Sequence, residues 1–75
     1  MIFTADIEIK TQNKLERKLV LERLRRETNL TWQSGHELTK FTPEHNDMLY
    51  IGFDHVTCGS KEFLRKKQIQ AKQLL

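Results

Sequence analysis

The chain has 75 residues, a formal net charge of +3 and one cysteine, Cys58. This length fits a single domain over residues 1–75, and one cysteine excludes an internal disulfide and favours a reducing, cytoplasmic location. No apolar run approaches the roughly 18 residues of a membrane span, and the first ten residues alternate apolar and polar side chains where a signal peptide has an apolar run.

The charge is unevenly distributed along the chain. Residues 11–29 carry six basic and three acidic groups, and residues 61–75 carry five basic and one acidic group. Residues 30–60 hold one basic and four acidic groups, so the middle of the chain is acidic. Segregation of this kind can steer an anionic partner toward the basic segments.

Residues 2–10 show the clearest strand pattern. Apolar side chains fall on one face of this strand, at Phe3, Ala5, Ile7 and Ile9. Polar side chains fall on the other face, at Thr4, Asp6, Glu8 and Lys10. A period of two predicts one buried and one solvated face, and therefore an antiparallel sheet that is covered on one side.

A helix is predicted from residue 13 to about residue 28. Asn13 suits the N-cap position and Glu16 the N3 position, where their side chains can satisfy free backbone N–H groups. One face of the helix carries Val20, Leu21 and Leu24. Leu15 and Leu19 point away from that face, so they either wrap around the core or meet a partner.

Shorter strands and a second helix are expected in the rest of the chain. We predict a short strand at residues 30–33, an irregular acidic loop at 36–47, a strand at 48–53, a turn at 54–55, a strand at 56–58 and a helix at 61–75. Ile69 does not fit the apolar face of that last helix.

These elements predict an α+β fold, in which a small antiparallel sheet of three to four strands packs with two helices in the order β-α-β-β-β-α. The residues expected in the core are Phe3, Ile7, Ile9, Val20, Leu24, Trp32, Leu49, Ile51, Phe53, Val56 and Phe63.

Residues 31–36 form the best candidate binding segment. Trp32 offers a flat ring for stacking, and Ser34, Gly35 and His36 can donate to a phosphate or a base edge. The alternative is a core tryptophan at a strand end, followed by a turn that needs the conformational freedom of glycine. The two interpretations are compatible, because a ring that is buried on one side can still stack on its other side.

The same segment carries a resemblance that covers roughly residues 15–60. The matching positions are Trp32, Ser34, Gly35, Thr39, Phe41, Pro43, Tyr50, Ile51, Val56 and Thr57. They resemble small uncharacterised proteins encoded by phages and prophages of Gram-positive bacteria. The resemblance implies a phage accessory protein, a class that often blocks host enzymes or immune systems or captures nucleotide signals. It does not extend to the first strand or to the basic C-terminal segment.

Basic side chains form one stripe on each predicted helix. Lys14, Lys18 and Arg25 lie within about 40° on the first helix, and so do Lys61, Arg65 and Lys72 on the last. Such stripes can follow the phosphates of a nucleic acid, or they are ordinary solvated helix faces. The sequence has no phosphate-binding glycine loop to support the first interpretation.

Catalytic and metal-binding motifs are missing from the sequence. His55 and Cys58 are three residues apart on a strand, which places them on opposite faces, and no closely spaced ligand pair is present. Ser34 with His36 lacks the glycine pattern of a nucleophile elbow. We therefore expect no enzyme activity, no catalytic residue, no metal and no cofactor.

Three functions follow as hypotheses. The first is a non-enzymatic phage-type accessory or inhibitor protein that binds a host protein, such as a nucleic-acid-handling or anti-phage defence component. The second is direct binding of a nucleic acid or small nucleotide through the basic helices and the Trp32 segment. The third is a homodimer or larger homo-oligomer, held by open sheet edges, by the leucines at 15, 19, 74 and 75, or by contact between the acidic loop and the basic helices of a second copy.

Overall fold

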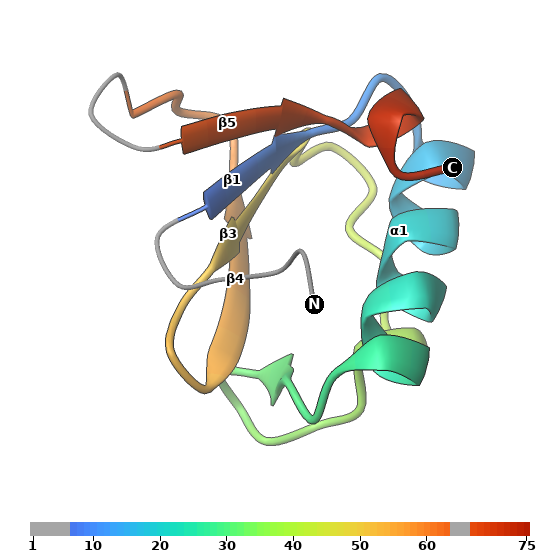
Figure 1. Ribbon diagram of the computed structural model, residues 1–75, viewed down its shortest axis with the longest axis vertical. Coiled ribbons are helices and arrows are strands. Elements are labelled where there is room, and N and C mark those ends of the chain that lie inside the picture. The colour runs from blue at the N-terminus through green and yellow to red at the C-terminus, as the bar shows by residue number, and fades with distance from the viewer. Residues whose placement is uncertain (1–6, 64–66) are drawn as a thin grey trace.

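A mixed β-sheet and one long helix form the part of the chain that the computed structural model describes, residues 7–63 and 67–75 (Figure 1). The elements in chain order are β1 (Ile7–Lys10), α1 (Lys14–Glu27), β2 (Thr31–Trp32), η1 (Leu38–Lys40), β3 (Met48–Ile51), β4 (His55–Gly59), β5 (Lys67–Gln70) and η2 (Ala71–Gln73), where η1 and η2 are short 3-10 helices. Helix α1 covers one face of the sheet, and the apolar side chains of both layers meet between them.

The structure confirms the α+β class and corrects the sheet. Five strands are hydrogen-bonded in the order β2-β4-β3-β1-β5, where three to four were predicted. Strand β3 is antiparallel to β1 and to β4, but β5 runs parallel to β1 and β2 runs parallel to β4. The sheet is therefore mixed, because both of its edge strands join in parallel.

The predicted helix at residues 61–75 is wrong. The described residues of that segment include β5, which places Ile69 opposite Ile9 of β1, and the short turn η2. An open β1 edge would expose a row of N–H and C=O groups, and pairing with β5 satisfies them. Ile69, which did not fit the helix, packs against the core.

Helix α1 begins where the sequence predicts. The side-chain oxygen of Asn13 accepts a hydrogen bond from the Glu16 N–H at 2.9 Å. At the other end, the Thr28 N–H and hydroxyl both donate to the Leu24 carbonyl, which satisfies an acceptor that the helix leaves open. Local side chains therefore set both ends of α1.

Most of the predicted core is buried, and the phenylalanines are the exceptions. Strand β3 stops at Ile51 and β4 begins at His55, so Phe53 lies at the tip of the hairpin between them. Its side chain is therefore 91% exposed. Phe63 is 37% exposed, and Phe3 lies outside the described residues. Buried apolar residues that the prediction omitted are Leu21, Leu38, Met48, Ala71 and Leu74.

The expected solvated face of the first strand is wrong at Glu8. This residue is only 1% exposed. Its neighbours Ile7 and Ile9 face the core under α1, so strand alternation places Glu8 on the opposite face of the sheet. Its two carboxylate oxygens accept from the Phe63 N–H at 3.2 and 3.0 Å, and one also accepts from the Gln68 amide at 3.4 Å. The chain that follows β4 therefore covers part of the second sheet face and is held there by a buried acid.

The acidic loop lies against α1 of its own chain. Arg17 is 4% exposed, and its guanidinium donates to the Pro43 carbonyl at 2.9 Å and to the Glu44 carbonyl at 2.8 Å. Lys14 forms an ion pair with Glu44, which lowers the pKa of that carboxyl, and Arg25 pairs with Glu37. Within the described residues, the loop acids Glu37 and Glu44 therefore pair with α1 of the same molecule. The sequence suggests instead a contact between this loop and the basic helices of a second copy.

Tyr50 gives a pH-dependent prediction. Burial raises the pKa of its phenol, with a contribution from the nearby Glu8 carboxylate. The folded state therefore disfavours the ionised phenol, so the stabilising contribution of Tyr50 is present below pH 10 and is lost as the pH rises further. We expect the free energy of unfolding to fall more between pH 9 and pH 11 in the wild type than in Tyr50→Phe. Urea denaturation at both pH values measures this, and equal slopes would contradict it.

Candidate functional site

A pocket of about 580 Å³ opens at the β2–β4 edge of the sheet, around the segment that the sequence singled out. We call it the Trp32 pocket. The described residues that line it are Trp32, Gln33, Ser34, His36, Lys40, Phe41, Val56, Thr57 and Cys58. It brings together the end of β2 with its following turn, the residues at the end of η1, and the middle of β4.

A tight turn shapes one wall of the pocket. The Gly35 N–H donates to the Trp32 carbonyl at 2.8 Å, and the Trp32 N–H donates to the His36 carbonyl at 3.0 Å. Gly35 has a φ of 93°, a conformation that side-chain-bearing residues rarely adopt. The predicted glycine turn is therefore present, and it directs Ser34 and His36 to the pocket edge, where their side chains are hydrogen-bonded at 2.9 Å.

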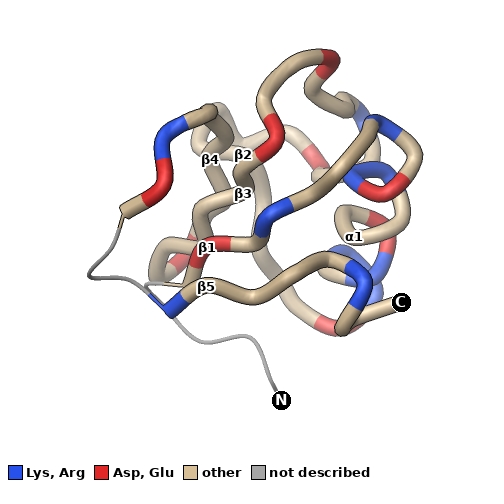
Figure 2. The backbone as a smooth tube through the Cα atoms, turned by 90° about the horizontal axis from the view of Figure 1, so that it is seen from above, with Lys and Arg blue, Asp and Glu red and all other residues tan. Residues whose placement is uncertain are grey.

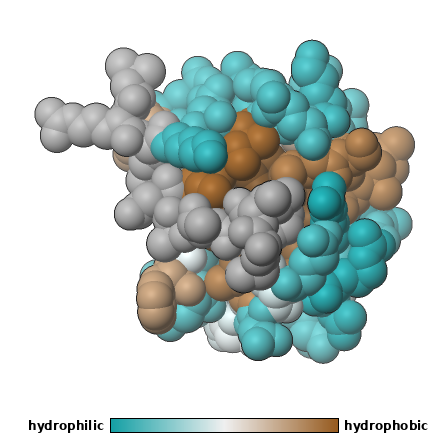
Figure 3. Space-filling model, in the orientation of Figure 1, coloured by the Kyte–Doolittle hydropathy of each residue, from teal (hydrophilic) through white to brown (hydrophobic). Residues whose placement is uncertain are grey.

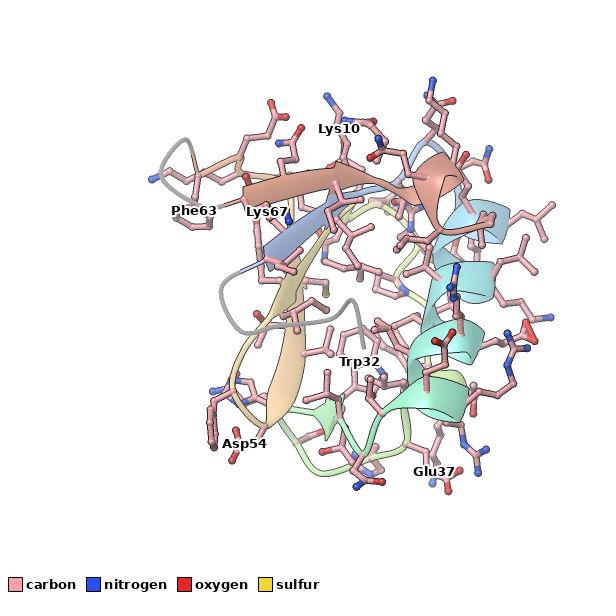
Figure 4. The ribbon with its side chains drawn as sticks, viewed as in Figure 1. Lys10, Trp32, Glu37, Asp54, Phe63 and Lys67 are labelled. Carbon is pink, nitrogen blue, oxygen red and sulfur yellow. The ribbon has the colours of Figure 1, made fainter. Side chains whose placement is uncertain are left out.

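Apolar side chains form the floor of the pocket. The Trp32 ring is 7% exposed and lies between the sheet and α1, and its indole N–H donates to the Leu38 carbonyl at 3.2 Å (Figure 4). Phe41 meets this ring edge-on, with centroids 5.7 Å apart, and is 55% exposed. Trp32 is therefore mainly a core residue, and Phe41 offers the more accessible aromatic face.

The rim of the pocket is polar, with one cation. Lys40 is exposed and makes no ion pair with any residue in the described ranges 7–63 and 67–75. Ser34, His36 and Thr57 add groups that donate or accept hydrogen bonds. None of the described lining residues is an aspartate or glutamate, so the charge of the rim favours an anionic ligand group.

The basic stripe on α1 is present in the helix, but most of its charge is neutralised. Lys14 pairs with Glu44 and Arg25 pairs with Glu37, which leaves Lys18 as the member with no acidic partner among the described residues. These three residues lie on the helix and do not line the Trp32 pocket.

The second predicted stripe does not form. Lys61 lies in the connection after β4, with its ammonium 5.3 Å from the centre of the Phe63 ring, and Lys72 lies in η2. Arg65 lies outside the described residues. Figure 2 shows the basic positions spread around the molecule, because the segment that was expected to align them contains a strand and a 3-10 turn.

A smaller hollow of about 370 Å³ lies between α1 and the C-terminal residues. Leu15, Leu19 and Leu75 are 65%, 40% and 56% exposed, and hydrophobic surface is visible on the α1 side of the molecule in Figure 3. Leu74 is only 5% exposed and belongs to the core, although it also lines the hollow together with Leu19 and Leu75. The proposed self-association through these leucines stays a prediction.

Of the site residues predicted in the candidate segment, Trp32, Ser34 and His36 line the pocket, whereas Gly35 forms the turn behind it. The sequence did not assign Lys40 or Phe41 to a site. Other members that it did not assign to a site are Gln33, Val56, Thr57 and Cys58. Phe41 is nine residues after Trp32, and only the return of the chain through η1 brings the two rings together. The Thr-x-Phe-x-Pro pattern contained Phe41, but no rule of spacing assigns such a residue to a pocket.

The described residues contain no group of three or more histidine, cysteine, aspartate or glutamate side chains placed to hold a metal ion. Over the same ranges, no helix is both long and apolar enough to cross a membrane.

Comparison with known proteins returns no relative. No protein-family model matches the chain, and neither the curated proteins nor the solved structures contain a match. Its function is therefore inferred from the geometry and chemistry of the Trp32 pocket.

Proposed function

We propose that this protein is a non-enzymatic binding module that takes part of a partner protein into the Trp32 pocket. In line with the resemblance to phage-encoded proteins, its partner is a host protein, and the module acts as an accessory or inhibitor. The observation that carries the proposal is the position of the pocket, since it forms where the candidate segment, an exposed aromatic ring and a sheet edge meet.

The form of the pocket supports a protein ligand. Its volume of about 580 Å³ lies in the range of known ligand sites, roughly 300–1,000 Å³. Phe41 is an aromatic residue at the surface, a type that often anchors protein interfaces. An apolar floor with a polar rim matches the anatomy of such interfaces, in which one buried side chain supplies much of the binding energy.

The charge arrangement argues against a large nucleic-acid surface. Phosphate binding depends on basic side chains that are free to replace counterions. Lys14 and Arg25 already pair with acids of the loop, and Lys10 is 3.5 Å from Glu62. The described residues of this chain therefore do not form a continuous basic surface.

A small nucleotide is the second candidate for the same pocket. Phe41 offers a ring for base stacking, and Lys40 with Ser34 and His36 offers a cation and hydrogen-bonding groups for a phosphate. Because Trp32 is the only tryptophan in the chain, its fluorescence reports on any ligand that enters. Titration with cyclic nucleotides and with short DNA or RNA at two salt concentrations tests this candidate, since binding through phosphates weakens with salt.

The test of the main proposal is retention of a host protein by the immobilised chain. Lysate from a Gram-positive bacterium is passed over the wild type, Phe41→Ala and Phe53→Ala, with and without nuclease. We expect one stoichiometric protein that survives nuclease treatment and binds Phe41→Ala about tenfold more weakly, because truncating an aromatic anchor costs about 1.4 kcal/mol or more.

Phe53→Ala is the matched control, since Phe53 is 91% exposed at the hairpin tip and does not line the pocket. We expect it to retain the partner as the wild type does. Absence of any retained protein, or equal retention by both alanine variants, would overturn the proposal.

A further inference from the structure

The edge of β4 that adjoins the Trp32 pocket is open over part of its length. Strand β2 has two residues and β4 has five. The two strands run parallel, and their last paired residues are Trp32 and Val56. The Gln33 N–H makes a last bond to the Val56 carbonyl at 3.2 Å, after which the turn through Gly35 carries the chain away.

The next edge groups on β4 belong to Cys58. Backbone groups of a strand alternate in direction, so the N–H and C=O of Cys58 point to the same side as those of Val56, toward the pocket. The groups of Thr57 point the other way, toward Tyr50 of β3. Within the described ranges, no backbone hydrogen bond reaches Cys58 from the β2 side. One donor and one acceptor are therefore available there to an extended chain.

The pocket lies on the face where an added strand would place alternate side chains. Val56 and Cys58 line the pocket from β4, and Phe41 lines it from the segment after η1. An apolar side chain of an added segment can fill this floor. The cation of Lys40 lies on the rim of the same pocket, so it can meet an anionic side chain on the same face of the segment, two residues along.

We propose that the Trp32 pocket binds a short extended segment of its partner protein by strand addition at Cys58, with an apolar side chain on the floor and a carboxylate two residues away beside Lys40. This inference rests on the proposed function and names its ligand chemistry. Two complementary features carry it: the open backbone groups bind main chain of any sequence, and the pocket with its single cation selects the side chains.

Synthetic pentapeptides with blocked ends test the inference on the full chain. The first is Ac-Thr-Leu-Thr-Glu-Thr-NH2, the second has glutamine in place of glutamate, and the third has glycine in place of leucine. Binding is followed by amide and indole chemical shifts in nuclear magnetic resonance spectra, with hydrogen exchange measured at the Cys58 amide. We expect the first peptide to shift the Trp32 indole signal and to slow exchange at Cys58.

We expect the three peptides to differ measurably in their affinity for the chain. At low salt the glutamine peptide binds about threefold to tenfold more weakly than the glutamate peptide, and the glycine peptide shows no saturable binding. Lys40→Gln removes the difference between the glutamate and glutamine peptides. Lys18→Gln, an exposed lysine on α1 away from the pocket, keeps that difference.

Each contrary result overturns a stated part of the inference. Equal binding of the glutamate and glutamine peptides overturns the role of the carboxylate. Shifts at Trp32 without slower exchange at Cys58 overturn strand addition. If no peptide binds and adenosine monophosphate shifts the Trp32 indole, the site takes nucleotides and the inference fails. Retention of a host protein that depends on Phe41, with no peptide binding, overturns the inference but keeps the proposed function.

Discussion

Arg17→Met is expected to lower the free energy of unfolding by about 3 kcal/mol. The Arg17 guanidinium is buried and donates to the carbonyls of Pro43 and Glu44 and, at 3.0 Å, to the hydroxyl of Thr11. Methionine fills similar space but leaves these acceptors without a donor. Urea denaturation followed by circular dichroism measures the change.

Two variants define how that result is interpreted. Arg26→Met changes an exposed arginine of the same helix, and we expect its free energy of unfolding to stay within about 0.5 kcal/mol of the wild type. Arg17→Lys keeps the charge but loses the planar arrangement of donors, so an intermediate loss is expected. If Arg17→Met and Arg26→Met are equally stable, the loop is not held by the guanidinium.

Glu8→Ala is expected to lower the free energy of unfolding by about 2 kcal/mol. The substitution removes the two carboxylate oxygens that accept from the Phe63 N–H, one of which also accepts from the Gln68 side-chain amide. Hydrogen bonds to a charged acceptor are worth more than neutral ones, and the Phe63 amide loses the partner that Glu8 supplies. Chemical denaturation at pH 7 gives the size of the effect.

Glu62→Ala is the control for Glu8. Its carboxylate is exposed, lies 3.5 Å from Lys10 and accepts from Gln68 at 2.9 Å, and this amide hydrogen bond together with the lysine lowers its pKa. Exposed ion pairs of this kind contribute little, so we expect almost no change in stability. A larger loss for Glu62→Ala than for Glu8→Ala would show that the surface network, and not the buried acid, holds the connection to β5.

Arg17 and Glu8 share a property that bears on the candidate site. Each is a charged residue that binds backbone groups of a distant loop, and each therefore positions chain that has no regular structure of its own. Arg17 holds the loop that leads from Phe41 to β3, and Phe41 at the start of this loop lines the Trp32 pocket. Loss of Arg17 is therefore expected to lower retention of the proposed partner protein as well as the stability of the fold.

Local sequence was sufficient for α1, β3 and the glycine turn. Their signals act over a few residues: the Asn13 side chain caps the next turn of its own helix, and Gly35 adopts a φ that other residues avoid. Alternation correctly placed Ile7 and Ile9 in the core. The α+β class follows from these elements together.

Tertiary structure decided the rest. The segment that contains β5 has a helical pattern of charge and apolar residues, and the open edge of β1 makes it a strand, since satisfied backbone groups outweigh a modest propensity. Long-range contacts also bury Glu8 and Arg17 and bring Phe41 and Lys40 to Trp32. They pair two of the three basic residues of the α1 stripe, Lys14 and Arg25, with acids of the loop. The sequence by itself pointed to residues 31–36 as the candidate segment, four of which line the Trp32 pocket. The return of the chain through η1 determined that this segment forms a pocket, because it adds Phe41 to the floor and Lys40 to the rim, and local pattern cannot assign either residue to the segment.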